Sequence, residues 1–233
     1  MSSAGFDDVT EQGTQRIPWV VGITGASGTP YAAAVLRGLL DALLPVDLVV
    51  SHAARLTMLD ETGWTFREAR WREDTEYFLG RDVGDMVVWR AGDFTAGPAS
   101  GSYQTRGMII VPATTAVIAG VATGISKDLI QRAADVTLKE RRPLVFVPRE
   151  TPLRQTTLRQ MADLAAEGAV ILPASPGFYA GAKDVCELVD FIAAKVLDVI
   201  GVPHTLSRRW TGQLGVATES PADCRQTSTR GYS

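Results

Sequence analysis

Six short apolar runs recur along the middle of the chain, and each has the length of a β-strand. Several are continuous rather than alternating, which is typical of strands covered on both faces. The runs are residues 19–23, 47–50, 86–89, 108–111, 144–147 and 169–172. The segments between them carry helical spacing, and strand–helix alternation implies right-handed crossovers. The pattern predicts one α/β domain with a single doubly wound, mostly parallel sheet and helices on both faces, as in Rossmann-like and flavodoxin-like folds.

The clearest helix is predicted near the end of the chain. One stripe at a 3.6-residue period is formed by Val185, Leu188, Val189, Ile192, Val196 and Val199. Gly201 and Pro203 favour an end to this helix. Another helix is expected to begin near Pro30, because proline is favourable in a first helical turn.

Residues 63–82 break the alternation of strands and helices. The segment is charged and carries three large aromatic residues, Trp64, Phe66 and Trp71. We expect it to run over the surface as an excursion from the sheet. Exposed aromatic side chains there would favour contacts between copies of the chain.

The ends of the chain differ in composition from its middle. Residues 1–16 and 214–233 have little to bury, which predicts two flexible tails around a domain at 17–213. The net charge of −3 gives no electrostatic reason to expect nucleic acid as a partner. No apolar stretch reaches the length of a membrane span, so we expect a cytoplasmic protein. The two cysteines match no metal or redox spacing, and no metal site is predicted.

Small and hydroxylated residues follow several of the predicted strands. They are Gly25-Ala26-Ser27-Gly28 after the first run, Ser51 after the second, Thr114-Thr115 after the fourth and Arg149-Glu150 after the fifth. The carboxyl ends of parallel strands meet at one edge of a sheet, where open α/β sheets bind ligands. Backbone N–H groups at the helix start after Gly28 suit a phosphate or another anion. The turn lacks the GxGxxG fingerprint of dinucleotide sites, so the sequence predicts a different phosphorylated cofactor at this edge.

Two charged groups allow a structural as well as a functional interpretation. Arg132, Asp135 and Lys139 share one helix face, where they can form a solvated basic surface with a local ion pair. Glu150 directly follows Arg149, and an ion pair at a strand end is common. Glu150 differs from an ordinary partner by its place at the carboxyl edge. The pattern alone leaves both alternatives open.

Ordered motifs cover most of residues 18–212. They are GITGASG at 22–28, ASGS at 99–102, RAADVTLKERRP at 132–143, VPRETPL at 147–153, PGFY at 176–179 and RW at 209–210. This set resembles the flavin prenyltransferases, the UbiX-like family within the flavin-dependent decarboxylase-like flavoproteins. Residues 63–94 match only loosely. The number and order of the motifs make the resemblance highly specific.

The resemblance implies roles for particular residues. FMN would be held by Gly25, Ala26, Ser27, Ser51, Thr114, Thr115, Ala116, Val117 and Arg149. Substrate-binding residues would be Lys139, Tyr179, Lys195 and Trp210, with Tyr179 and Lys195 on the phosphate of a dimethylallyl substrate. Catalytic roles would fall to Ser27, Glu61, Arg132, Lys139 and Glu150.

The resemblance also implies a reaction. Reduced FMN would accept the dimethylallyl group of dimethylallyl (mono)phosphate at N5 and C6, without a metal, to give prenylated FMN for a separate decarboxylase. A homododecamer with active sites shared between subunits is implied as well. Cations and a Tyr hydroxyl suit a departing phosphate, because they donate hydrogen bonds where charge develops. Ring closure needs a base, and Glu150 relayed through Ser27 would serve. Glu61 would be a second acidic group near the substrate.

Four positions depart from the family pattern. Asp128 stands where Asn is usual, Phe94 where some relatives have Trp, Val117 where a hydroxyl residue occurs and Lys195 where Arg is frequent. A carboxylate at 128 would change the charge near the flavin and leaves room for a diverged paralogue. Two other functions stay open: an FMN-dependent oxidative cysteine decarboxylase, whose helix-borne His we cannot locate, and a non-catalytic flavin carrier, which would need no second phosphate pocket.

Overall fold

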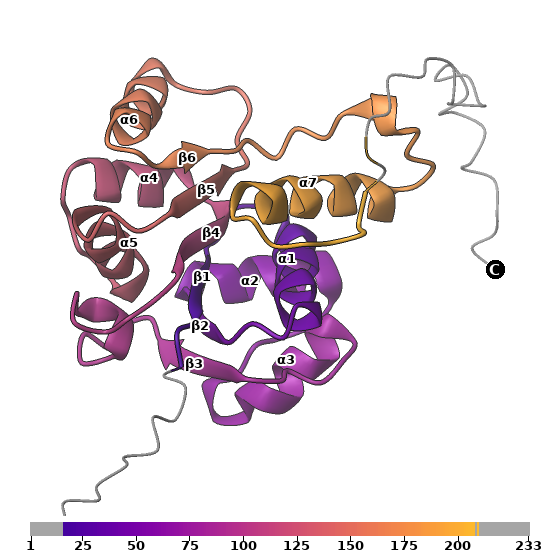
Figure 1. Ribbon diagram of the computed structural model, residues 1–233, viewed down its shortest axis with the longest axis horizontal. Helices are drawn as coiled ribbons and strands as arrows, with labels where there is room; N and C mark the ends of the chain where they lie inside the picture. Colours follow the sequence, from indigo (N-terminus) through magenta and orange to yellow (C-terminus); the bar gives the residue numbers. More distant parts are fainter. Residues whose placement is uncertain (1–15, 208, 210–233) are drawn as a thin grey trace, which may run out of the picture.

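The protein is built on a six-stranded sheet in the order β3-β2-β1-β4-β5-β6 (Figure 1). The computed structural model describes residues 16–207 and residue 209. The strands are β1 (Trp19–Ile23), β2 (Val46–Val50), β3 (Met86–Arg90), β4 (Gly107–Ala113), β5 (Leu144–Pro148) and β6 (Val170–Ile171), and every pairing is parallel. Each strand coincides with a predicted apolar run. The doubly wound parallel sheet is therefore confirmed.

Helices cover both faces of this sheet (Figure 1). One face carries α1 (Thr29–Asp41), α2 (His52–Thr62), α3 (Trp71–Leu79) and α7 (Val185–Val199), and the other carries α4 (Thr115–Ala122), α5 (Leu129–Lys139) and α6 (Gln155–Ala166). The buried apolar residues accordingly form two clusters, one between the sheet and each helical layer. In the part of the chain that the structure describes, no helix is both long and apolar enough to span a bilayer.

Helix α7 occupies the residues that its apolar stripe predicts. The middle of the stripe is buried against α1, whereas Val185 and Val199 at its two ends are exposed. Gly201 has a φ of 71°, and the amide of Val202 donates to the carbonyl of Leu197 at 2.9 Å. A left-handed glycine with such a back-bond closes a helix. The helix therefore ends where the sequence predicts.

Two of the three aromatic residues expected to be exposed in 63–82, Trp64 and Phe66, are buried, so the predicted exposed excursion is wrong on this point. Trp64 and Phe66 are only 7% and 3% exposed. The Trp64 ring stacks on Phe78 with centroids 5.1 Å apart and planes at 13°. The segment folds into a short 3-10 turn and α3, which packs these rings against the core. These two residues therefore give no reason to expect contacts between copies.

A buried carboxylate anchors the amino edge of the sheet. Asp47 in β2 is fully buried, and its oxygens accept from Arg16 Nη1 at 2.7 Å and from the Tyr103 hydroxyl at 2.9 Å. Arg16 Nε also pairs with Asp85 at 2.8 Å. Arg16, which composition assigns to the N-terminal tail, is thus held by the domain. The remainder of both predicted tails lies outside the described residues.

Tyr103→Phe should show how much this network stabilises the fold. A buried carboxylate with one partner fewer should lower the free energy of unfolding by about 1–3 kcal/mol at pH 7. Urea denaturation at fixed protein concentration measures the change, and the exposed Tyr77→Phe is the matched control, expected within about 0.5 kcal/mol of wild type.

The same pair should give a pH signature. Burial, reinforced by the hydrogen bond to Asp47, raises the pKa of Tyr103 from 10.0 to about 12. A raised folded-state pKa means that the Tyr103 contribution is fully present below pH 10.0 and is lost as pH rises through about 12. Wild type should lose this increment of stability in that window and Tyr103→Phe should not. Equal stability of the two proteins at pH 7 would contradict the role given to the hydroxyl.

Candidate functional site

Four neighbouring strands carry the residues predicted to hold a cofactor. In the order β2, β1, β4, β5, their carboxyl ends lead into Ser51, the turn 25–28, Thr114 and Arg149. The chain winds away in opposite directions from β1 and β4, and open α/β sheets bind ligands at such a switch point. The fold thus brings these residues to one edge of the sheet.

Thr24, which the sequence analysis did not single out, joins the two central loops of this edge. Its side chain is 1% exposed. The hydroxyl donates to the carbonyl of Pro112 at 2.7 Å and accepts from the amide of Thr114 at 2.9 Å. One hydroxyl therefore fixes the loop after β1 against the loop after β4. A threonine between an apolar strand and a glycine turn was visible in the sequence, but its partners were not.

The amino end of α1 is occupied by a carboxylate of the protein itself. Glu61, near the end of α2, accepts from the amide of Gly28 at 2.7 Å, from the amide of Thr29 at 2.8 Å and from the Thr29 hydroxyl at 2.7 Å. Burial opposes ionisation of Glu61, but hydrogen bonds from Ser27, Thr29 and the backbone outweigh it and hold its pKa below the usual range. The amides of Gly28 and Thr29 therefore already have an anionic acceptor, contrary to our expectation that they bind a phosphate.

The glycines of the turn are required by packing. A Cβ on Gly25 would lie 2.6 Å from the Cβ of Ala53 at the start of α2. Gly28 has a φ of 115°, and a Cβ there would meet the Tyr31 ring at 2.7 Å. On the same turn Ala26 is buried, whereas Ser27 is exposed. The turn is thus kept tight for internal reasons, and it presents Ser27 at the edge.

Two further helices begin at this edge with hydroxyl caps. The Ser51 hydroxyl caps α2 and the Thr114 hydroxyl caps α4, each accepting from the amide three residues ahead, at 3.1 and 3.2 Å. Each hydroxyl keeps its hydrogen for another acceptor, and a helix start favours an anion. Thr115 and Ala116 form the first turn of α4, with Ala116 exposed, while Val117 is buried in the core. These helix starts provide the anion-binding character that α1 lacks.

Arg149 reaches from β5 to the turn after β1. Its Nε donates to the carbonyl of Ser27 at 3.0 Å. Glu150 is exposed and accepts from the amide of Thr151 at 3.1 Å. Within the described residues no ion pair joins Arg149 and Glu150, so the structural alternative for Glu150 finds no support. The hydrogen bonds of the described residues include none between Glu150 and Ser27, so the relay through Ser27 stays a prediction.

A second cluster forms on α7 around Phe191, which the sequence analysis also did not single out. The Tyr179 ring lies edge-on to Phe191, with centroids 5.6 Å apart and planes at 83°. The Nζ atom of Lys195 lies 5.6 Å from the same ring centroid. Two predicted substrate residues are thus brought together by one aromatic ring.

A pocket of about 420 Å³ lies beside this ring. It is lined by Leu172, Pro173, Ser175, Phe191, Ile192, Lys195, Asp198 and Val199. The amide of Ala174 donates to the carbonyl of Pro148 at 2.9 Å, which holds the pocket's loop beside the carboxyl end of β5. Arg149 is the next residue along that strand end. The pocket therefore adjoins the edge that carries the predicted cofactor residues.

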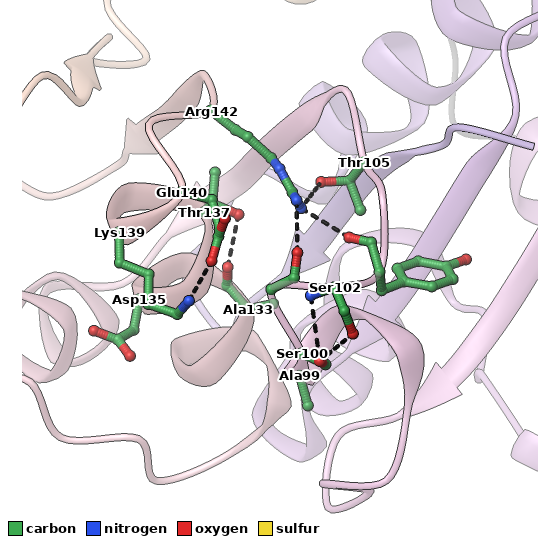
Figure 2. A network of polar contacts seen from close by, with 12 residues as sticks. Ala99, Ser100, Ser102, Thr105, Ala133, Asp135, Thr137, Lys139, Glu140 and Arg142 are labelled. Carbon is green, nitrogen blue, oxygen red and sulfur yellow. Dashed lines mark hydrogen bonds and ion pairs between the residues drawn. The ribbon is translucent and has the colours of Figure 1, made fainter.

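Arg132 and Lys139 lie on a different element, α5, and Figure 2 shows the network around Lys139. Arg132 donates to the carbonyl of Ala99 at 3.1 Å and pairs with Asp135 at 3.0 Å. Lys139 pairs with its neighbour Glu140, next to the loop of the ASGS motif. The local ion pair allowed for Arg132 and Asp135 therefore exists. Two family-matching segments far apart in sequence, 99–102 and 132–143, meet here.

This network does not join the Phe191 cluster within one chain. Helix α5 covers one face of the sheet, and α7, with Lys195, covers the other (Figure 1). Lys139 is at the end of α5, about 10 Å along the helix from Arg132, and so further from the carboxyl edge at which α5 begins. One copy of the chain therefore supplies the predicted substrate residues on opposite faces of its sheet.

One departure from the family pattern has a local explanation. Asp128 caps α5 and accepts from the amide of Gln131 at 3.0 Å, a task that Asn performs equally well. Phe94 is 48% exposed on the loop after β3. Trp210 lies outside the described residues. Among the residues that the structure describes, no three His, Cys, Asp or Glu side chains gather as a metal site.

Thr24→Val should weaken the cofactor site by removing the hydroxyl that joins its two central loops. Leaving the Thr114 amide unpaired should lower the free energy of unfolding by about 1–3 kcal/mol. If about half of this loss applies to the loops predicted to contact FMN, the affinity for FMN should fall about 2- to 13-fold. Titration by flavin fluorescence and urea denaturation measure the two effects. Thr24→Ser keeps the hydroxyl and should bind FMN within about twofold of wild type. Unchanged FMN binding by Thr24→Val would show that the loops hold their places without it.

Comparison with known proteins gives consistent results. The chain matches the family model described as Flavoprotein over residues 8–197. It is 59% identical over 212 residues to the flavin prenyltransferase UbiX of Streptomyces coelicolor, covering 86% of this chain and 98% of that protein.

Two solved structures are similar to this chain in both fold and sequence. The crystal structure of AnUbiX (PadA1) in complex with FMN and dimethylallyl pyrophosphate has a TM-score of 0.76 at 35% identity, over 85% of this chain and 100% of that one. A dodecameric FMN-dependent UbiX-like decarboxylase from Escherichia coli O157:H7 has a TM-score of 0.75 at 36% identity, over 84% and 100% of the two chains. The chain therefore belongs to the Flavoprotein family and, within it, to the UbiX flavin prenyltransferases.

Proposed function

We propose that this chain transfers a dimethylallyl group from dimethylallyl phosphate to reduced FMN, giving prenylated FMN. When bound, reduced FMN would supply the nucleophilic positions N5 and C6. The family membership supports this assignment, as does the structure of AnUbiX with FMN and dimethylallyl pyrophosphate. Everything else in the reaction falls to the chain's own residues.

The carboxyl edge has the donor set that FMN requires. Ser51 and Thr114 offer hydroxyl hydrogens at two helix starts, which suit a phosphate. Arg149 adds a guanidinium beside Ser27, and Gly25 keeps this turn close to the start of α2. One anion site with small residues around it fits a mononucleotide better than a dinucleotide. We assign FMN binding to these residues together with Ala26, Thr115, Ala116 and Val117.

The observation that carries the proposal is the second pocket, next to this edge. A flavin carrier would need only the first site, but here Lys195 and Tyr179 meet at a ring that lines another cavity. An ammonium and a phenol hydroxyl donate hydrogen bonds to a leaving phosphate as its charge develops. We therefore assign the allylic phosphate to Tyr179 and Lys195.

Glu150 is our candidate for the general base. Ring closure releases a proton, and Glu150 is an exposed carboxylate at the cofactor edge whose one recorded bond, among the described residues, comes from the Thr151 amide. Base assistance of this kind is worth about 10²–10⁴-fold. Glu61 is held by the start of α1 and can act on the reaction only through the hydroxyl of Ser27.

Active sites shared between subunits would bring together the α5 network and the Phe191 cluster, which lie on opposite faces of the sheet within one chain. The dodecameric Escherichia coli neighbour supports a large homo-oligomer for this chain. In such an assembly, Arg132 and Lys139 of one copy would complete the pocket at Tyr179 and Lys195 of another. This arrangement explains why α5 presents a half-exposed lysine with one intrachain carboxylate neighbour.

The product would then pass to a separate decarboxylase, as the family resemblance implies. We place this exchange in the cytoplasm. The ammonium of Lys195 and the hydroxyl of Tyr179 beside the pocket support an allylic phosphate as the donor.

The reaction itself is tested by mass spectrometry of the flavin. Purified protein should be incubated with FMN, reductant and dimethylallyl monophosphate, then denatured and the flavin weighed. We expect FMN increased by one dimethylallyl unit, with no product when the monophosphate is omitted. Recovery of unmodified FMN only would favour a carrier, and decarboxylation of a cysteine peptide under oxidising conditions would favour the cysteine decarboxylase.

Shared sites can be tested by mixing inactive subunits. Lys139→Ala and Tyr179→Phe should each lose most activity as homo-oligomers. When the two variants are co-expressed, random assembly should restore about a quarter of the sites, because some sites then draw the intact residue from each copy. Tyr179→Phe co-expressed with Lys195→Ala is the matched control and should stay inactive, since both residues come from one chain. Failure of the first mixture to regain activity would exclude sharing of Lys139.

A further inference from the structure

Phe191 is the structural link between the two groups that we assign to the allylic phosphate. It lies on α7 one turn before Lys195, is 8% exposed and belongs to the buried apolar cluster that includes α1. Its ring therefore has a fixed position. Tyr179 touches it from the loop and Lys195 covers it from the helix. A fixed ring in contact with two polar side chains can set the spacing between them.

The contact with Lys195 is selective. An ammonium within about 6 Å of an aromatic centroid is attracted by the ring, and the observed distance is 5.6 Å. Asp198 is the carboxylate one turn ahead that could compete for Lys195. It is instead engaged by Arg209 at 2.6 Å and by His204 at 3.0 Å. In the described part of the chain no carboxylate lies within ion-pair distance of Lys195, so the ammonium stays available to an anion.

The contact with Tyr179 depends on Gly177. A Cβ at Gly177 would lie 2.8 Å from a carbon of the Tyr179 ring and 3.3 Å from Cζ of Phe191. The glycine therefore leaves the space in which the two rings meet edge to face. Such pairs contribute about 0.5–1.5 kcal/mol beyond their burial. This gives the PGFY motif a physical reason that its sequence does not show.

We infer that Phe191 is a positioning residue, whose ring holds the Tyr179 hydroxyl and the Lys195 ammonium at the spacing that binds the phosphate of the allylic substrate. The inference rests on the proposed function. Phe191 itself contributes no hydrogen bond and no charge to the reaction. It acts only through its two neighbours, and Gly177 is the second part of the same arrangement.

The test measures binding of dimethylallyl monophosphate to the FMN-loaded, oxidised holoenzyme by calorimetry, where no turnover occurs. Phe191→Leu should weaken binding about 5- to 30-fold, because both ring contacts are lost. FMN affinity should stay within about twofold, since the ring is not at the cofactor edge. Phe178→Leu removes a neighbouring aromatic ring that is 74% exposed, and as the matched control it should bind like wild type.

A double-mutant cycle separates positioning from a general loss of stability. In a background that carries both Tyr179→Phe and Lys195→Met, the Phe191→Leu change should have almost no further effect on phosphate binding. An equal loss in both backgrounds would show that Phe191 acts through the fold as a whole and would overturn the inference. Unchanged binding by Phe191→Leu in the wild-type background would overturn it too.

A surface variant covers the case in which Phe191→Leu does not fold. Gly177→Ala removes no buried side chain and should displace the Tyr179 ring, weakening monophosphate binding about 3- to 10-fold. Wild-type binding by Gly177→Ala would count against the inference. If wild-type holoenzyme itself does not bind the monophosphate, the proposed function fails, and this result is distinct from a failure of Phe191 alone.

Discussion

Parallel pairing of every strand is the constraint on which the rest of the structure depends. It sends all carboxyl ends to one edge, and the strand order reverses direction between β1 and β4 at the middle of that edge. The loops on either side of the reversal diverge, so something must hold them in register. The buried Thr24 hydroxyl does this with two short hydrogen bonds, to Pro112 and Thr114. A rigid edge of this kind can present donors from four strands without a single long loop.

The helix starts at this edge are not equivalent. Both carboxylate oxygens of Glu61 accept from amides at the start of α1, so the anion-binding groups of that helix are occupied. A second anion there would meet like charge, since the pKa of Glu61 is held low by the same bonds. The starts of α2 and α4 are capped only by neutral hydroxyls, Ser51 and Thr114. An incoming phosphate is thereby directed away from the glycine turn and toward its neighbours.

The sheet could be predicted from the sequence because strands buried on both faces appear as continuous apolar runs. The ligand-binding edge could be predicted because the carboxyl ends of parallel strands lie at the same edge of the sheet. Contacts between residues that are far apart in the sequence could not be predicted. Trp64 and Phe66 looked like surface residues in a charged segment, but both are buried, and Trp64 stacks on Phe78 of α3. The roles of Thr24 and Phe191 come from partners on other elements, which no spacing encodes. Motifs identified the residues at 132–143 but not the face of the sheet on which they lie.

That face matters for the reaction as a whole. Helices α5 and α7 are separated by the sheet, so no side-chain movement within one chain can bring Lys139 to Lys195. If both cations serve one phosphate, assembly is a requirement of catalysis. Within one chain, Lys139 pairs with Glu140 and the ammonium of Lys195 lies over the ring of Phe191. Each cation is thus held by a weak, replaceable contact, which costs little to exchange for a phosphate oxygen when the site is complete.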